Sequence, residues 1–272
     1  MRPDWGYYGT YDESGHADLW DGVVAYWAPC LGPTGLRLHD VSRWNNWGTL
    51  TNMTAADDWV IDSGQYALDF DGSNDSVSIT TASVLPLGSV SRSMSIWFKI
   101  NTDTNASIAG YGGNGNNERF NFFRSTNLVG TNVIGIEITN SWSLFSFTND
   151  SKWHMLTAVY PGGTLSATQH YLDGVTQTAT SVSGGANTPN TTAGAPAMAM
   201  LPEVSAFYFN GQLDDYLVWN RPLSPNEVQR LYQLGRGGML ERRRRRRVYV
   251  EQAGFRAHYR AQRAQLIGGG LR

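Results

Sequence analysis

Residues 209–228 read FNGQLDDYLVWNRPLSPNEV, in which an alternating segment runs directly into a capped one. In an extended strand, Leu213, Asp215, Leu217 and Trp219 would share one face, and Asp214, Tyr216 and Val218 the other. Ser224, Pro225 and Glu227 then form the pattern of a capping box with proline at the first helical position. The stretch therefore predicts a strand over 212–219 and a helix from 225 that ends at Gly235.

The rest of the chain up to this point is rich in short alternating segments. Met94, Ile96, Phe98 and Ile100 recur at every second position, and Ile134, Ile136 and Ile138 repeat the pattern. In 142–147 the apolar positions change parity, which predicts a β-bulge. We expect strands at 23–27, 65–71, 76–80, 93–100, 119–124, 132–138, 142–147, 153–160, 168–177, 204–209 and 212–219. The segments 101–118 and 181–199 are predicted to be long loops.

Three ordered motifs resemble one known family. The 209–228 stretch resembles the closing motif of laminin-G-like jelly-roll domains, in the concanavalin A-like lectin and glucanase superfamily. Residues 66–77 (YALDFDGSNDSV) resemble the family's early strand and turn, and residues 153–160 (WHMLTAVY) with 171–174 (YLDG) resemble its central hairpin. The resemblance implies an all-β fold: a two-sheet antiparallel jelly-roll sandwich with one short C-terminal helix, followed by an Arg-rich extended or helical tail.

Composition and charge divide the chain into three parts. We expect an N-terminal arm at 1–19, a jelly-roll domain at 20–235 and a basic tail at 236–272. The tail holds eleven Arg against two Glu, a net charge of +9, so the remainder carries −11. Cys30 is the single cysteine, which excludes an intrachain disulfide and makes the fold depend on packing.

The tail is predicted to attach the protein to an acidic partner. Aromatic and aliphatic side chains fall near one helical face, and Arg recurs at i, i+4 and i+7 on another. An Arg cluster suits phosphate or carboxylate equally well, but the apolar face favours protein docking over nucleic acid. The predicted anchoring residues are Arg242, Arg243, Arg244, Arg245, Arg246, Arg247, Phe255, Arg256, Tyr259, Arg260, Arg263 and Leu266.

Two clusters combine aromatic rings with amides, which is the chemistry that carbohydrate recognition requires. A ring stacks on the face of a sugar, while Asn bonds its hydroxyl groups. The first cluster is Tyr111 with Asn114, Asn116 and Asn117, and the second is Trp44 with Trp47. The Trp44–Trp47 segment departs from the Gly, Asn and His that relatives more often show there. Most of the ten Trp are expected in the core or at interfaces.

Acidic residues raise the questions of metal binding and catalysis. Asp69, Asp71, Asn74 and Asp75 gather oxygens at a strand end and turn, where they would suit Ca²⁺, although the same residues are ordinary turn formers. Asp214 and Asp215 could contribute further ligands from a facing strand. No Glu-x-Asp-x-Glu is present, and the adjacent acidic pairs would point to opposite faces of a strand, so we expect no enzyme activity and no cofactor other than calcium.

These observations and the resemblance imply a non-catalytic protein of a phage-like virion, either a head decoration or a tail or adhesion component. Its arm and tail would bind other virion or capsid subunits in many copies or as a homo-oligomer, and its jelly roll would bind a surface glycan. The sequence has neither a signal-peptide run nor a membrane span, so we expect assembly in the host cytoplasm and no membrane partner. The alternative is a free-standing soluble lectin. A glycoside hydrolase relative and a nucleic-acid-binding protein are the weaker readings.

Overall fold

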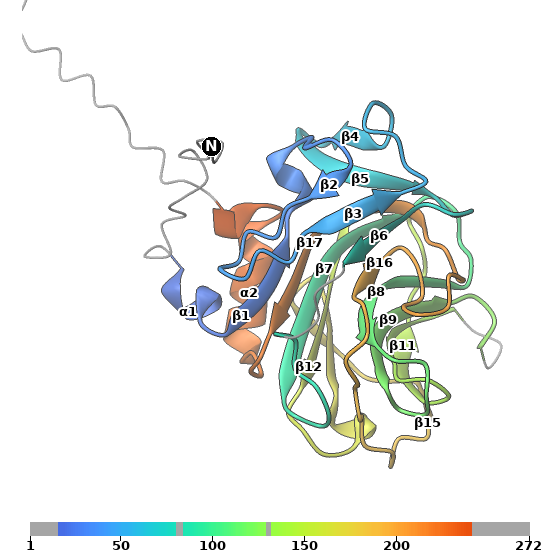
Figure 1. Cartoon of the computed structure of the whole chain (residues 1–272). Helices are drawn as coiled ribbons and strands as arrows, with labels where there is room; N and C mark the ends of the chain where they lie inside the picture. The colour runs from blue at the N-terminus through green and yellow to red at the C-terminus, as the bar shows by residue number, and fades with distance from the viewer. Residues whose placement is uncertain (1–15, 80–83, 129–131, 241–272) are drawn as a thin grey trace, which may run out of the picture. The chain divides into compact units, whose positions relative to one another are not determined.

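Two antiparallel sheets pack face to face in the compact unit His16–Met239 (Figure 1). The computed structural model describes residues 16–79, 84–128 and 132–240. Sheet A has the order β14-β13-β12-β7-β17-β5-β4, and β1 also pairs with β17. Its strands are β1 (Val23–Trp27), β4 (Trp59–Asp62), β5 (Gln65–Asp71), β7 (Arg92–Ile100), β12 (His154–Tyr160), β13 (Gln169–Leu172), β14 (Val175–Gln177) and β17 (Asn210–Trp219).

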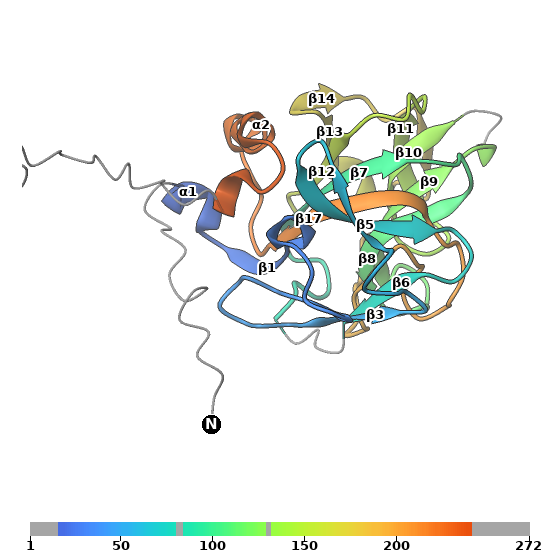
Figure 2. The same ribbon diagram turned by 90° about the horizontal axis from the view of Figure 1, so that it is seen from above.

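Sheet B has the order β15-β11-β10-β9-β8-β16-β6-β3-β2. Its strands are β2 (Arg37–Leu38), β3 (Gly48–Thr51), β6 (Ser76–Ile79), β8 (Ala106–Gly112), β9 (Arg119–Ser125), β10 (Val133–Glu137), β11 (Trp142–Ser146), β15 (Ser181–Ser183) and β16 (Ala197–Met198). Seen from above, the two sheets form separate layers, with α2 (Pro225–Leu234) lying outside them (Figure 2). The predicted two-sheet jelly roll is confirmed.

The core lies between the sheets and takes alternate residues from each. Met94, Ile96, Phe98 and Ile100 of β7 face Ile134 and Ile136 of β10 within one buried cluster. Each such side chain contributes about 1.5–3 kcal/mol when fully buried, so the alternation seen in the sequence decides which face of each strand turns inward.

The closing helix forms as its sequence predicts. Ser224 accepts a hydrogen bond from the Glu227 N–H, and the Glu227 carboxylate accepts one from the Ser224 N–H, completing the capping box. The helix ends at Leu234, before Gly235, whose φ of 75° favours glycine. Among the described residues, no helix is long and apolar enough to cross a membrane.

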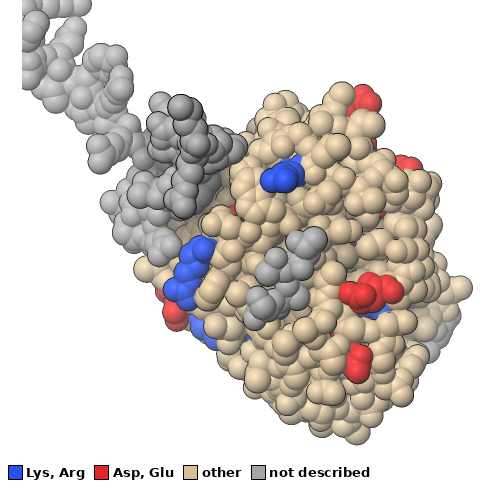
Figure 3. Space-filling view, in the orientation of Figure 1, with Lys and Arg blue, Asp and Glu red and all other residues tan. Residues whose placement is uncertain are grey.

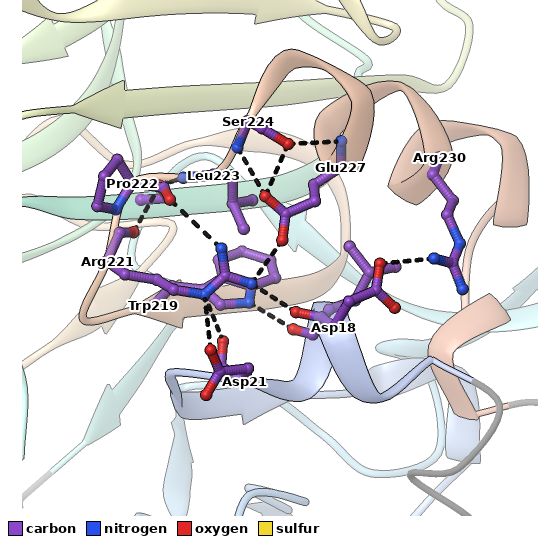
Figure 4. Close-up of polar contacts among 11 residues, drawn as sticks. Asp18, Asp21, Trp219, Arg221, Pro222, Leu223, Ser224, Glu227 and Arg230 are labelled. Atoms are coloured by element: carbon purple, nitrogen blue, oxygen red, sulfur yellow. Dashed lines mark hydrogen bonds and ion pairs between the residues drawn. The ribbon is translucent and has the colours of Figure 1, made fainter.

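A short helix, α1 (Ala17–Trp20), is held by hydrogen bonds and an ion pair to the segment 219–230, which includes the first turns of α2 (Figure 4). Arg221 donates to the backbone carbonyls of Asp18 and Asp21 and to the Glu227 carboxylate. Arg230 pairs with the Asp18 carboxylate at 2.5 Å, and the Trp219 indole donates to the Leu19 carbonyl at 2.7 Å. The remaining helical turns are η2 (Pro29–Leu31), η4 (Leu165–Ala167) and η5 (Gly238–Leu240).

Strand β17 contains a bulge that the alternating sequence does not reveal. Its register against β7 shifts between Asp214 and Leu217, and Asp215 has φ 45°. The bulge lies where the partner of β17 along this edge changes. Up to Leu213, β17 pairs with β5, and from Tyr216 it pairs with β1. Asp214 and Asp215 therefore both reach one cluster around Cys30, and the prediction that they point to opposite faces is wrong.

Several other predicted boundaries are corrected. The 101–118 segment contains β8, whose seven residues are all buried, so its small side chains and glycines reflect close packing rather than a loop. The 181–199 segment contains β15 and β16, whereas 204–209 contains no strand. The register between β10 and β11 is continuous, so the parity change in 142–147 is no bulge: Leu144 and Phe145 are buried on opposite faces.

Candidate functional site

An amide-rich cluster, Asn114, Asn116 and Asn140, lies where the β8–β9 loop meets the β10–β11 turn. All three side chains are exposed, and the Asn140 amide donates to the Asn116 side-chain oxygen at 2.7 Å. Thr139 and Asn140 form the turn with φ of 61° and 60°. Asn tolerates this left-handed conformation, whereas a β-branched Thr there is strained.

A buried ion pair supports the amide cluster from below. Arg119 donates twice to the Glu137 carboxylate, from Nε and from an Nη, each at 3.0 Å. The other Nη of Arg119 donates to the Asn114 side-chain oxygen at 3.1 Å, and Glu137 also accepts the Thr139 N–H at 2.6 Å. The pair therefore fixes both the loop and the turn, while the Asn114 and Asn116 side chains remain exposed.

Trp142 brings an aromatic ring to the same surface. It pairs with Glu137 across β10 and β11, so both side chains lie on the outer face of sheet B. Its ring is half-buried, and its indole N–H donates to the Ser181 hydroxyl at 3.0 Å. Two neighbouring polar groups, the Asn121 amide nitrogen and the Thr139 hydroxyl, are buried without a hydrogen-bond partner.

The aromatic ring predicted for this surface was a different one. Tyr111 lies in β8 with 0% exposure, and its hydroxyl donates to the Pro86 carbonyl at 3.1 Å. Its position in the strand turns it to the core and leaves Gly110 on the outer face, so Tyr111 cannot meet a sugar and the prediction is wrong for this residue. Asn117 lies beside the cluster as a half-buried turn residue with φ 62°. The sequence offered the 142–147 segment only as a strand, so Trp142 was missed.

A second surface is formed by Trp44 and Trp47 in the β2–β3 loop. Trp44 is 45% exposed, whereas Trp47 is half-buried with its ring centroid 3.9 Å from that of His39. Three strand steps separate β3 from β8 and five separate it from β10, so this loop lies about 14–24 Å along the sheet from the amide cluster. The two predicted carbohydrate clusters are therefore separate surfaces.

Comparison with known proteins places this architecture in a family. Residues 71–229 match the family described as the concanavalin A-like lectin/glucanases superfamily. The chain belongs to this superfamily. No curated protein matches its sequence significantly.

Solved structures share the fold at low sequence identity. Domain 4 of AbnA, a GH43 extracellular arabinanase from Geobacillus stearothermophilus solved with arabinotriose, is 16% identical with a TM-score of 0.56, over 78% of this chain and 98% of that one. The binding domain of botulinum neurotoxin serotype D/C is 15% identical with a TM-score of 0.53, over 79% and 52%. Trypanosoma rangeli sialidase in complex with sialic acid is 14% identical with a TM-score of 0.52, over 78% and 33%. At these identities the likeness shows the superfamily fold alone.

The residues predicted to bind calcium in this superfamily member are engaged in turn chemistry. Asp71 accepts the N–H groups of Ser73 and Asn74, and Asp75 accepts the Asp71 N–H at 3.1 Å. Burial raises the pKa of Asp75, whereas backbone hydrogen bonds from Ser73 and Asn74 help to lower that of Asp71. Within the described part of the chain, Asp69, Asp71 and Asp75 are not among the sets of three His, Cys, Asp or Glu side chains whose ligand atoms converge, and calcium binding at these residues stays a prediction.

The converging set is Cys30, Asp214 and Asp215, whose ligand atoms lie within 4.8 Å of one another. Asp215 accepts hydrogen bonds from the Tyr26 hydroxyl, the Cys30 thiol and the Gly237 N–H. Arg236 lies 3.7 Å from the second oxygen of Asp214 and stacks on Trp153. Burial, and then the neighbouring carboxyl, raises the pKa of Asp214, and burial likewise raises the pKa of the Cys30 thiol. The predicted tail-anchoring residues, 242–266, lie outside the described residues.

Proposed function

We propose that this protein is a non-catalytic carbohydrate-binding jelly-roll module carried by a larger assembly. The observation that supports binding best is the amide cluster, held in place by the Arg119–Glu137 pair beside the ring of Trp142. Sugars offer hydroxyl groups to amides and an apolar face to an indole, and a fixed surface loses little conformational entropy on binding. The GH43 arabinanase domain of the same fold was solved with arabinotriose, which is in keeping with this use of the fold.

The non-catalytic part of the proposal rests on the acidic groups. Glycoside hydrolysis needs two carboxyl groups separated by a space that the scissile bond can enter. Asp214 and Asp215 are adjacent in the sequence and only 0% and 3% exposed. Their oxygens accept hydrogen bonds from Cys30 and Tyr26, and Asp214 lies beside the Arg236 guanidinium. On the proposed binding surface, the Glu137 carboxylate forms an ion pair with Arg119.

The carrier that we propose is a phage-like virion, with the protein as a head decoration or a tail or adhesion component. The basic tail supports attachment, because its net charge of +9 suits an acidic partner subunit. The remaining chain has the opposite sign, so the positive charge is concentrated in the tail. Arg236 and Gly237 pack on the buried Asp214–Asp215 pair, so a deletion should keep them. A chain ending at Leu240 should no longer co-sediment with particles, and high salt should weaken co-sedimentation of the full chain. A free-standing lectin, the alternative function, would pellet in neither form.

Binding is tested by isothermal titration of the full-length protein with neutral oligosaccharides, arabino-oligosaccharides among them. The double variant Asn116→Ala with Asn140→Ala should weaken binding roughly 5- to 150-fold, because each of the two lost hydrogen bonds is worth about 0.5–1.5 kcal/mol. Asn74→Ala, an exposed amide in another turn, is the matched control and should bind as the wild type does. Unchanged affinity in the double variant, or no neutral glycan bound by the wild type, would refute the proposed site.

A further inference from the structure

Arg37 and Arg43 differ from the other basic residues that the structure describes. Within the described ranges, ten Lys and Arg are present, and seven of them pair with a carboxylate: Lys99, Arg119, Arg124, Lys152, Arg221, Arg230 and Arg236. Arg92 is buried and donates to backbone carbonyls. Arg37 and Arg43 are exposed, and neither has a carboxylate partner in that part of the chain.

Both guanidinium groups lie against the tryptophan rings of the β2–β3 loop. The Arg43 guanidinium is 5.0 Å from the ring centroid of Trp44, and that of Arg37 is 5.8 Å from the ring of Trp47. Stacking on a ring orients the flat guanidinium while its N–H edge stays open to an acceptor. Trp47 is half-buried against His39, whereas Trp44 is 45% exposed, so Trp44 is the ring with the larger accessible surface.

The loop that carries these groups is held by a buried carboxylate. Asp40 is 3% exposed and accepts five hydrogen bonds, from the Tyr26 N–H, the Ser42 N–H and hydroxyl, and the Asn46 N–H and side-chain amide. The Trp27 indole also donates to the Asn46 carbonyl at 2.5 Å. The loop is thus fixed before any ligand arrives, which reduces the entropic cost of binding.

We infer that Arg37, Arg43 and Trp44 form a second binding site, for a saccharide that carries carboxylate groups. The sugar ring would stack on Trp44, and its carboxylates would accept from the two guanidinium groups in the bidentate geometry that suits Arg. This inference rests on the proposed carbohydrate-binding function but names a separate surface, about 14–24 Å along sheet B from the amide cluster. A neutral sugar would leave the two cations without a counterpart.

Charge favours such a saccharide over nucleic acid. The described residues hold ten basic side chains against eighteen acidic ones, so a phosphate chain extending beyond the loop would meet a surface of its own sign. Figure 3 shows one face of the molecule, on which Lys and Arg reach the surface at a few separate places rather than as a continuous basic track. A short ligand with one charge per sugar needs only the local pair.

The test uses the full-length protein with trigalacturonate, its neutral methyl ester, a sulfated disaccharide and a short single-stranded oligonucleotide. Arg37→Gln with Arg43→Gln should weaken trigalacturonate binding about tenfold or more, because hydrogen bonds to charged groups are the stronger class. Lys152→Gln, an exposed lysine elsewhere, is the control and should change nothing. Hydroxyl-radical footprinting read by mass spectrometry should show Trp44 protected by trigalacturonate, which separates this loop from the basic tail as the binding site.

The outcomes separate this inference from the proposed function. Unchanged trigalacturonate affinity in the double Arg variant, or a footprint that omits Trp44, would overturn the inference. Protection of Trp44 by the oligonucleotide alone, or by the sulfated sugar alone, would overturn it as well. Neutral-glycan binding lost in the Asn116→Ala and Asn140→Ala variant tests the amide cluster independently. If trigalacturonate still protects Trp44 in that variant, the second site stands by itself.

Discussion

Replacing Asp40 with Asn should destabilise the protein by about 2–6 kcal/mol. One Asp40 oxygen accepts the N–H groups of Tyr26 and Ser42, and an Asn oxygen can keep both. The other accepts the Ser42 hydroxyl and two Asn46 donors, the N–H at 2.8 Å and the side-chain amide at 2.9 Å. An Asn nitrogen in that place faces these two donors without accepting from either, and each unsatisfied buried donor costs about 1–3 kcal/mol.

Urea unfolding followed by tryptophan fluorescence measures this loss as a fall in the midpoint at constant slope. The matched control is Asp57→Asn, because Asp57 is exposed and accepts only from the Thr54 side chain, at 3.0 Å. It should change the unfolding free energy by less than about 0.5 kcal/mol. If Asp40→Asn is as mild as Asp57→Asn, the loop is not held by Asp40 and its rigidity has been misjudged.

Two further predictions concern buried titratable groups. Burial lowers the pKa of His170 from 6.5 to about 4. His170 therefore folds neutral, its stabilising contribution is complete above pH 6.5, and about 2 kcal/mol is lost by pH 5. His170→Gln should flatten this part of the stability profile in urea titrations at successive pH values, and an unaltered slope would contradict the reasoning. Arg236→Met should cost about 3 kcal/mol at pH 7, because it leaves Asp214 and Asp215 buried without their cation. Because the pKa of Asp214 is raised, this carboxyl should become protonated as the pH falls, and the stability loss should then be smaller. Thermal melts at pH 5 and pH 7 measure the difference. An equal loss at both pH values would argue against the Asp214–Asp215 pair as the source of the destabilisation.

Local patterns predicted the elements whose causes are local. The strand β5 has the bounds 65–71 that its alternation predicts, and β1 the bounds 23–27. The capping box fixes where α2 begins, because Ser224 and Glu227 satisfy each other within one turn. Each of these features depends on residues that lie close together in the chain, so no knowledge of distant partners was needed.

The corrections have long-range causes. The β17 bulge exists because two strands far apart in the sequence, β1 and β5, share one edge of β17 on either side of Asp214–Asp215. Strand β8 was taken for a loop because its glycines and small residues lack alternation, yet a Cβ on Gly110 would lie 2.6 Å from the Asn121 Cα. The neighbouring strand β9 leaves space only for small residues at these positions of β8. The sequence of β8 alone does not reveal this constraint.

Half of the candidate site was foreseeable. Asn114 and Asn116 were recognisable as exposed amides within a Gly and Asn-rich loop, and the structure leaves both exposed. Their support could not be predicted, because Arg119–Glu137 and Trp142 join the site through pairings between β9, β10 and β11. A useful signal was the Thr139–Asn140 pair, since Asn commonly occupies the tight turns that bring two strands together.

The register of sheet B explains why its outer face offers two separate surfaces instead of one continuous platform. Cross-strand partners follow one another from β2 to β11 in the order Arg37, Thr49, Ser78, Ala197, Gly110, Asn121, Glu137 and Trp142. The middle of this row consists of small residues that cannot project toward a ligand, and Gly110 has no space for a larger one because of Asn121. In this row, the large side chains of Arg37, Glu137 and Trp142 therefore stand at the two ends. Two sites at that separation would bind one glycan together only if the glycan spans the row. A multi-copy assembly would instead combine the sites of several copies through avidity.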